Sequence, residues 1–560
     1  MNFSGKILFE MLGKGEYQKI IDNFNFDDLE VNEKFVFIES LFELNLYNEI
    51  KIKLESIKNE TLNSENKLKY HFFFARLKLS IDSLEETKKT IEELDSFVKK
   101  IQENHPIMKL KVDLLKNEML LKAGHYINAK KSTIAILDYL EEKFPQECKL
   151  QADYVNLIGK INAISGDYLQ AKNYFQKYLT LTKKMENKFL ISNAYNNLGL
   201  IKKSLGELDA SLECFDQALI NIDGFTNNFI RTRILNNMAL VNYALGNFIK
   251  ALEYHKQCLL IREEMGNREL IANSLNNIGI IYHLQGLNHD ALNVFTRSLQ
   301  IREELGNPRT ILISKFNLAM IYREIENFTL ALEIIRGIEQ SLEAFPNTEM
   351  FFRISIEKII VFFNSGLLFQ NKIDLERNID KFSENSNMVE LYLHIFDGLL
   401  KFEEKRYSES LKSLEKAIGD SSLEYETKLF CIEIIIRGLI LTLRKVTDLN
   451  KLEQIKKYLN HYKEISEKNN LSSHLCKVYL LKAKLDLIFF NYEETEKNLQ
   501  QSIKIAQKSG LPKHLEVALQ EKKKIQQNKK LTSVSRVAKK EPALEELNQY
   551  LKDLKKILGK

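Results

Sequence analysis

The middle of this 560-residue chain repeats itself every 40 residues. Turn positions recur at Gly166, Gly206, Gly246, Gly286 and Glu326. Five residues after each turn position comes a small residue: Ala171, Ser211, Ala251, Ala291 and Ala331. Four residues further on the residues are Phe175, Phe215, His255, Phe295 and Ile335. A repeat of this length indicates stacked supersecondary units rather than one globular core.

Each copy of the repeat has the pattern of two amphipathic helices joined at the turn. Before and after Gly286, apolar residues follow steps of three and four, which place them on one helical face. They are Leu275, Ile278 and Tyr282, then Leu292, Phe295 and Leu299. With only 21 Gly and 6 Pro, the chain also offers few turns for a β or α/β fold. We therefore predict an all-α chain of stacked helical hairpins.

These residues resemble the tetratricopeptide repeat. The first-helix signature is present as Asn197-Leu198-Gly199 and Asn277-Ile278-Gly279, and the Gly-x-x-x-x-Ala hairpin signature follows it. The 40-residue spacing is similar to that of spindle-orientation adaptors, kinesin light chains and prokaryotic signalling regulators. The resemblance implies an αα-superhelix whose first helices line a concave groove.

About 13 hairpins are expected, and the regularity of the repeat divides the chain into five parts. They are divergent helical repeats at 1–150, the regular array at 151–340, divergent repeats with a capping helix at 341–530, a flexible basic linker at 531–542, and an amphipathic helix at 543–560. The last helix has a seam of Leu544, Leu547, Leu551, Leu554 and Leu558. A short isolated helix is marginal in water, so something should cover this seam. A second copy could do so, although two heptads are short for a coiled coil. We favour docking on apolar repeat surface, in the protein's own groove or on a partner, and the alternative is a frayed tail.

Composition and motifs exclude several classes of function. A net charge of +5 is too small for a dedicated nucleic-acid binder, and the apolar runs are too short to cross a membrane. Five scattered Cys residues indicate reduced thiols and a cytoplasmic protein. None of the common catalytic motifs occurs, so we predict no enzyme activity, no cofactor and no metal. His255 and His283 are interpreted as packing or surface residues, and Arg262 and Arg302 as residues of a solvated helix end.

A second stripe of residues runs beside the core face of the first helices, and we predict that it forms a peptide-binding groove. Its members are Asn193, Asn197, Leu200, Arg233, Asn237, Leu240, Asn273, Asn277, Ile280, Asn317 and Met320. In the resembled family, Asn at this position holds the backbone of an extended peptide in several members. The alternative is that these Asn side chains bond neighbouring helices and hold the hairpins in register. The apolar residues three positions after each Asn argue against a two-carboxylate clamp in these central repeats.

The resemblance and the missing motifs together predict a protein-interaction scaffold or adaptor. Its groove would bind an extended or helical segment of a partner protein. The alternative is a regulator whose superhelix changes shape when it binds a peptide and thereby switches an effector.

Overall fold

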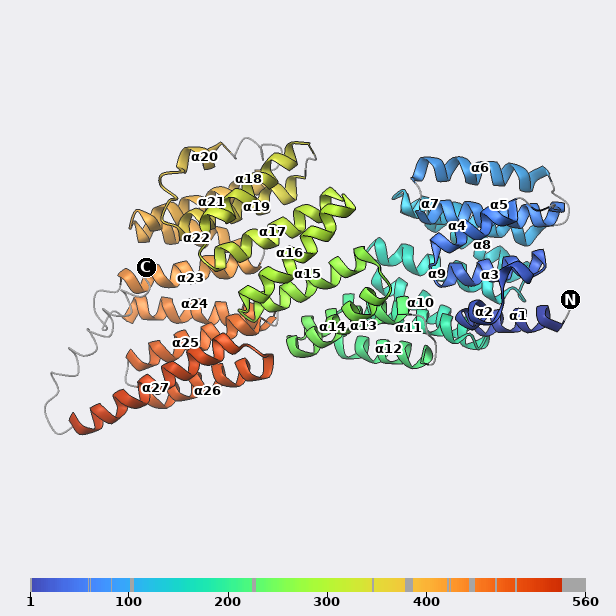
Figure 1. The fold of residues 1–560 in the computed structure, drawn as a ribbon. Helices are drawn as coiled ribbons and strands as arrows, with labels where there is room; N and C mark the ends of the chain where they lie inside the picture. The colour runs from blue at the N-terminus through green and yellow to red at the C-terminus, as the bar shows by residue number, and fades with distance from the viewer. Residues whose placement is uncertain are drawn as a thin grey trace. The chain divides into compact units, whose positions relative to one another are not determined.

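The computed structural model is helical throughout its described part, in which no β-strand occurs (Figure 1). The all-α prediction is confirmed. The structure describes residues 3–58, 60, 62–81, 83–100, 105–223, 228–344, 347–377, 386–420, 423, 425–442, 449–468, 471–488 and 491–535.

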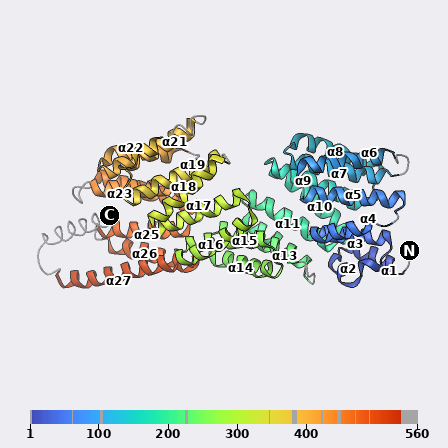
Figure 2. The same cartoon turned by 45° about the horizontal axis from the view of Figure 1, so that its top comes forward.

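The chain divides into two compact units, Met1–Val241 (unit 1) and Asn242–Lys560 (unit 2), and the division falls within one helix. Within each unit, consecutive helices pair as hairpins that stack on one another (Figure 2). Unit 1 contains α1 (Phe3–Lys14), α2 (Tyr17–Asn23), η1 (Phe26–Asp28), α3 (Val31–Glu43), α4 (Tyr47–Lys58), α5 (Ser64–Ile81), α6 (Leu84–Lys100), α7 (Pro106–Lys122), α8 (Tyr126–Lys143), α9 (Cys148–Ile164), α10 (Tyr168–Lys184), α11 (Lys188–Ser204), α12 (Leu208–Asn221) and most of α13 (Asn228–Ala244).

Unit 2 continues the same pattern with longer interruptions towards its end. Its helices are α14 (Phe248–Glu264), α15 (Arg268–Leu284), α16 (Asn288–Leu305), α17 (Pro308–Glu324), α18 (Phe328–Ala344), α19 (Thr348–Asn364), α20 (Lys372–Glu376), α21 (Ser386–Glu403), α22 (Tyr407–Gly419), α23 (Tyr425–Thr442), α24 (Leu449–Lys468), α25 (Ser472–Ile488), α26 (Tyr492–Ser509) and α27 (Pro512–Ser535). The predicted division into five parts follows the regularity of the repeat and stays a proposal. It differs from the two compact units, because the boundary between the units falls inside the regular array.

The predicted turn positions are where the chain reverses. Gly166 and Gly286 adopt φ values of 83° and 72°, in the left-handed region that glycine tolerates without strain. Glu326 takes the same conformation with φ of 61°, so the turn persists where the glycine is missing. The 40-residue spacing therefore reports real hairpin turns.

The small residues of the repeat mark the closest approach of the two helices in a hairpin. Ala171 and Ala291 are fully buried, as the repeat predicts. The first helix also comes close, because a Cβ built on Gly279 would lie 2.6 Å from Cε1 of Phe295. Gly199 and Phe215 show the same separation of 2.6 Å. The glycine and the aromatic ring thus form one packing unit.

Two arginines of the repeat correct the sequence interpretation. Arg262 and Arg302 were expected at a solvated helix end, but they are only 5% and 6% exposed. Nη1 of Arg262 donates to Oγ of Ser274 at 2.7 Å, and Nη1 of Arg302 donates to Oγ of Ser314 at 2.8 Å. Each guanidinium reaches a serine in the next helix, so hydrogen bonds compensate its burial. The prediction was wrong because a charged residue at a helix end was assumed to face water.

Unit 1 brings its first helices against a helix far along the sequence. The rings of Tyr17 in α2 and Phe189 in α11 pack edge to face with centroids 4.8 Å apart. Nδ2 of Asn187 donates to the carbonyl of Gly13 at 3.1 Å and lies 3.2 Å from the Tyr17 hydroxyl. These contacts close the stack of hairpins on itself.

Unit 2 closes in a comparable way. Residues of its first helices share one buried apolar cluster with residues of its last helices: Phe248, Ala251 and Ile281 with Cys476, Ala506 and Leu511. A Cβ built on Gly510, at the end of α26, would lie 2.8 Å from Cγ1 of Ile249. The closing contact of unit 2 therefore joins α14 and α15 to α25, α26 and the start of α27.

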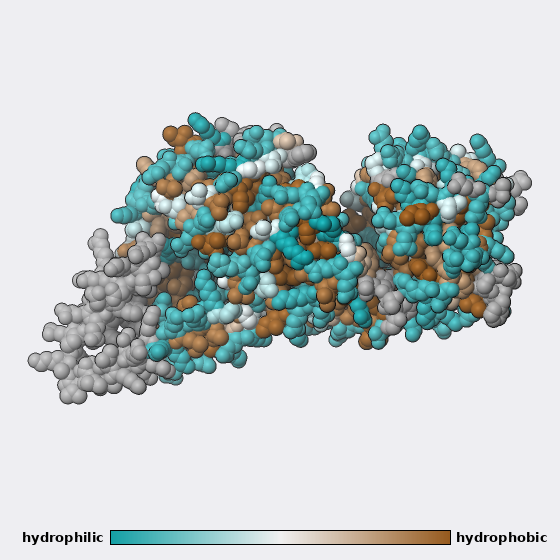
Figure 3. Space-filling view, viewed as in Figure 1, coloured by the Kyte–Doolittle hydropathy of each residue, from teal (hydrophilic) through white to brown (hydrophobic). Residues whose placement is uncertain are grey.

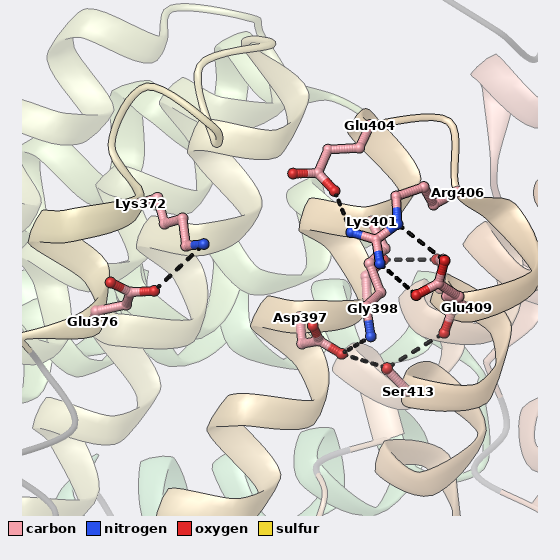
Figure 4. A network of polar contacts seen from close by, with 10 residues as sticks. Lys372, Glu376, Asp397, Gly398, Lys401, Glu404, Arg406, Glu409 and Ser413 are labelled. Carbon is pink, nitrogen blue, oxygen red and sulfur yellow. Dashed lines mark hydrogen bonds and ion pairs between the residues drawn. The ribbon is translucent and has the colours of Figure 1, made fainter.

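The divergent end of the chain keeps the hairpin plan with different polar contacts. In the α21–α22 hairpin, Oγ of Ser410 donates to the carbonyl of Gly398 at 2.6 Å. Nζ of Lys401 lies 2.7 Å from Asp397 (Figure 4). Arg406 in the turn pairs with Glu404 and Glu409. These bonds fix a hairpin whose sequence only weakly matches the repeat.

The C-terminal boundary differs from the prediction. Helix α27 runs to Ser535, so it enters the segment 531–542 that was expected to be a flexible linker. No Gly or Pro occurs there before Pro542, so nothing in the sequence stops the helix at residue 530. The predicted amphipathic helix at 543–560 lies outside the described residues.

The surface gives no sign of a membrane-spanning element. Apolar and polar side chains are mixed over the face shown in Figure 3. Among the described helices, none combines the length and the apolarity that a transmembrane span requires.

Candidate functional site

The predicted Asn stripe forms hydrogen bonds between neighbouring hairpins. Nδ2 of Asn197 donates to Oδ1 of Asn156, and Nδ2 of Asn237 donates to Oδ1 of Asn196, each at 2.9 Å. In unit 2, Nδ2 of Asn317 donates to Asn276 with the same length, 2.9 Å. The alternative interpretation predicted such bonds between neighbouring helices, and their role in holding the hairpins in register stays a prediction. Peptide binding by the stripe stays a proposal.

Other members of the stripe also form hydrogen bonds with side chains of the protein. Arg233 donates to Oδ1 of Asn193 in unit 1. In unit 2, Nη2 of Arg302 donates to Oδ1 of Asn273 at 3.0 Å. Leu200 is 36% exposed, whereas Leu240 is partly buried. The stripe is thus a ladder of polar contacts along the first helices, with apolar side chains beside it.

Unit 2 encloses a cavity of about 730 Å³, and the structure brings three predicted residues together there. Ile280, Asn317 and Met320 line it, whereas Asn273 and Asn277 do not. The remaining predicted residues, Asn193, Asn197, Leu200, Arg233, Asn237 and Leu240, belong to unit 1. This volume is typical of a site for a small ligand or for a few side chains of a peptide.

One wall of the cavity is apolar. It consists of side chains from the first helices of successive hairpins, α17, α19, α21, α23 and α25: Phe316, Met320, Phe352, Ile356, Ile360, Leu391, Phe430 and Leu480. The guanidinium of Arg353 lies over the ring of Phe316, 5.2 Å from its centroid. This wall can bury apolar side chains of a ligand.

Several charged side chains of the cavity form ion pairs. Arg323 bonds Glu357, and its Nη1 lies 2.7 Å from Oε1 of Glu324. Burial by itself would lower the pKa of Arg323, but Glu357 and Glu324 raise it above the ordinary value. Nζ of Lys477 lies 3.9 Å from Glu433. The Arg323 group is therefore a fixed part of the wall, in which one guanidinium contacts two carboxylates.

Three histidines from helices far apart in the sequence also line the cavity. They are His283 from α15, His474 from α25 and His514 from α27. The pKa of His474 falls to about 3, through burial and then the positive charge of Lys477. Burial, Lys477 and Lys513 lower the pKa of His514 to about 4. Sequence reasoning missed His474 and His514, because α25 and α27 carry no clear repeat signature.

Charged side chains from several helices of unit 1 form an ionic network. Nζ of Lys149 lies 3.4 Å from Glu43 and 3.2 Å from Asp153, and Arg76 lies 3.6 Å from Glu43. Burial would raise the pKa of Glu43, but Lys149 and Arg76 lower it below the usual value. Burial raises the pKa of Asp153 and of Glu118. Charged groups thus compensate one another across four helices.

The described residues contain no group of three or more His, Cys, Asp or Glu side chains with the geometry of a metal site. All five Cys residues are free thiols. Burial raises the pKa of Cys258 to about 11 and that of Cys476 to about 12. Both thiols are therefore protonated and unreactive at neutral pH.

Comparison with known proteins agrees with this repeat architecture. Family profiles for the tetratricopeptide repeat match residues 152–185, 192–219, 231–304 and 270–336. No curated protein sequence matches the chain.

Several solved structures are similar to this chain. The apo form of RapI is 15% identical, with a TM-score of 0.51 over 63% of this chain and 96% of its own. The apo form of the quorum sensor NprR from B. thuringiensis is 15% identical, with a TM-score of 0.44 over 64% of this chain and 99% of its own. BtubC from P. vanneervenii is 18% identical, with a TM-score of 0.37 over 40% of this chain and 94% of its own.

The fold defines an all-α helical-repeat protein, and RapI shares that fold. The chain contains tetratricopeptide repeats, which the family profiles recognise between residues 152 and 336.

Proposed function

We propose that this protein is a non-catalytic interaction scaffold or adaptor, and that the cavity of unit 2 binds an extended or helical segment of a partner protein. The observation that carries the proposal is the apolar wall, built from first helices of successive hairpins around a volume of about 730 Å³. Apolar side chains of a partner would gain free energy by leaving water there.

A single pair of phenylalanines tests this assignment. Phe352 lines the cavity, whereas Phe369 is 58% exposed and lies outside it. Partners captured by the full-length protein should be lost or reduced about tenfold with Phe352→Ala, since a buried aromatic contact is removed. They should be retained with Phe369→Ala. Equal capture by both variants, at equal thermal stability, would place the binding site elsewhere.

A second candidate is a peptide-responsive regulator, and the closing contact of unit 2 favours it. That contact joins α14 and α15 to α25 and α26 through only a small apolar cluster, and the cavity is lined from both sides of it. A ligand that binds the closed form better would shift the equilibrium between closed and open forms. Small-angle scattering of the full-length protein with and without a captured partner segment distinguishes the two. A changed radius of gyration supports the regulator, and an unchanged one supports the rigid scaffold.

A further inference from the structure

The basic side chains of the unit 2 cavity are gathered at one end of it. His283, His474, Lys477, Lys513 and His514, which we call the basic corner, come from α15, α25 and α27, the helices beside the closing contact of the unit. The side chain of Lys513 packs over Gly286, with its Cδ 3.2 Å from the position of an added Cβ. The corner is therefore assembled only when the two ends of unit 2 meet.

Two of the three histidines in the corner have unused hydrogen-bonding capacity. Within the described part of the chain, the Nδ1 atoms of His283 and His514 are buried and have no hydrogen-bond partner. A buried imidazole nitrogen without a partner costs free energy, and a bound ligand can supply the missing bond. His474 differs, because its Nδ1 lies 2.9 Å from the hydroxyl of Tyr462, which fixes its orientation.

Four acids and four Lys or Arg side chains line the cavity as a whole, so an excess of positive charge exists only locally, in the corner. Lys477 lies 3.9 Å from Glu433, near the limit for an ion pair, and Lys513 has no ion-pair partner among the described residues. The other acids close to His283, Glu324 and Glu357, are held by Arg323 on α17. The lowered pKa values of His474 and His514 have burial as their first cause and the lysine charges as their second, in agreement with a positive potential at this point.

We propose that the basic corner binds a carboxylate of the ligand whose apolar side chains occupy the rest of the cavity. The imidazole N–H groups would donate to the carboxylate oxygens, and Lys477 and Lys513 would supply the charge. The carboxylate is the free C-terminus of a peptide segment or an acidic side chain within it. This inference rests on the proposed function, because it assigns one end of the same cavity.

The chemistry of the ligand can be tested with short peptides. The probe is a mixture of N-acetylated tetrapeptides of Leu, Phe, Met and Ala, prepared with a free C-terminal carboxylate and, separately, as C-terminal amides. A third mixture of amides carries one internal Asp or Glu. Binding to the full-length protein is measured by equilibrium dialysis and mass spectrometry.

The acid mixture, or the amide mixture with an internal acid, should be retained about tenfold more than the plain amides, the size expected for one charge-assisted contact. Which of the two is retained identifies the source of the carboxylate. Equal retention of all three mixtures would overturn the carboxylate site and leave the proposed function standing. No retention of any mixture would contradict both.

Variants then locate the contact. The double change Lys477→Gln and Lys513→Gln should remove the preference for the acid mixture over the plain amides. The matched control is Lys508→Gln, an exposed lysine of α26 that does not line the cavity. An unchanged preference in the double variant, with normal thermal stability, would also overturn the proposal.

Discussion

Units 1 and 2 are built from the same kind of hairpin, and both close on themselves, yet their inner faces differ. In unit 1 the inner groups are ionic: Glu43, Arg76, Lys149 and Asp153 contact one another across three helices. In unit 2 the inner face surrounds a cavity of about 730 Å³ with an apolar wall and a basic corner. The same kind of hairpin packing can therefore carry inner faces of different chemistry.

This difference indicates a division of labour. The charged side chains of the unit 1 network pair with one another, so they leave little for a ligand to gain. Unit 2 has exposed apolar surface and unpartnered imidazole nitrogens inside a cavity, which a ligand can satisfy. We expect unit 1 to contribute stability and unit 2 to contribute binding.

Acidification should produce the largest difference in stability between the two units. Burial lowers the pKa of His255 to about 4 and that of His474 to about 3, whereas an unfolded histidine has a pKa of about 6.5. Because the folded state disfavours the charged form, stability is full above about pH 6.5 and is lost as the pH falls towards these values. At pH 5, His255 alone should cost unit 2 about 2 kcal/mol.

Unit 1 should respond less, because its described part has no fully buried histidine. The raised pKa values of Asp153 and Glu118 even favour its folded state when the acids are protonated. Hydrogen exchange at pH 7 and pH 5, corrected for intrinsic rates, measures each unit separately. His255→Gln should reduce the loss in unit 2. An equal loss of stability in both units at pH 5 would contradict the predicted difference between them.

Overpacking a hairpin should affect both units alike. Ala171 in unit 1 and Ala291 in unit 2 are fully buried at the same repeat position. Replacing either by Leu should cost about 1 to 3 kcal/mol, since no space exists for the added atoms. Thermal unfolding of the two variants measures the cost. If either variant were as stable as the parent, the shared packing rule would be wrong for that unit.

Removing one charge from the unit 1 network should destabilise that unit only. Glu43→Gln leaves Lys149 and Arg76 without their shared partner, and because these groups are half-buried the cost should be about 1 to 2 kcal/mol. The control is Glu409→Gln, which removes an exposed partner of Arg406 and should leave stability unchanged. Chemical denaturation followed by hydrogen exchange assigns the effect to a unit. Equal effects of the two changes would show that the network contributes nothing specific.

Changes in the Asn ladder should have the smallest effects on stability. They should distinguish the two units by their effect on partner binding. Asn197 in unit 1 and Asn317 in unit 2 donate the same bond of 2.9 Å to the preceding hairpin. Ala at either position should cost about 1 kcal/mol of stability. Only Asn317 lines the cavity, so only Asn317→Ala should also weaken a captured partner. If Asn197→Ala weakened binding as much, the groove would have to include unit 1.

Much of the fold could be predicted because the repeat fixes it locally. The turn at Gly286, the buried Ala291 and the pairing of Gly279 with Phe295 all follow from spacing. The burial of Arg262 could not be predicted, because the serine that compensates it lies in another helix. Its sequence neighbours Glu263 and Glu264 suggested an exposed face.

The candidate site was predicted only in part. Ile280, Asn317 and Met320 were found because they repeat along the first helices. His474 and His514 join them through the contact that closes unit 2, between residues about 200 positions apart, as in the contact of Ile281 with Leu511. A periodic pattern carries no information on where a stack of hairpins meets its own beginning.

Photo-crosslinking from the two inner faces tests the division of labour most directly. A benzophenone amino acid placed at Phe352, in the unit 2 cavity, should form adducts with a partner in cells, and one placed at Glu118, beside the unit 1 network, should not. The side chains at both positions are partly exposed, so a crosslinker at either position is comparably accessible to a partner. Adducts from Glu118 as abundant as those from Phe352, or adducts from Glu118 alone, would contradict the assignment of binding to unit 2.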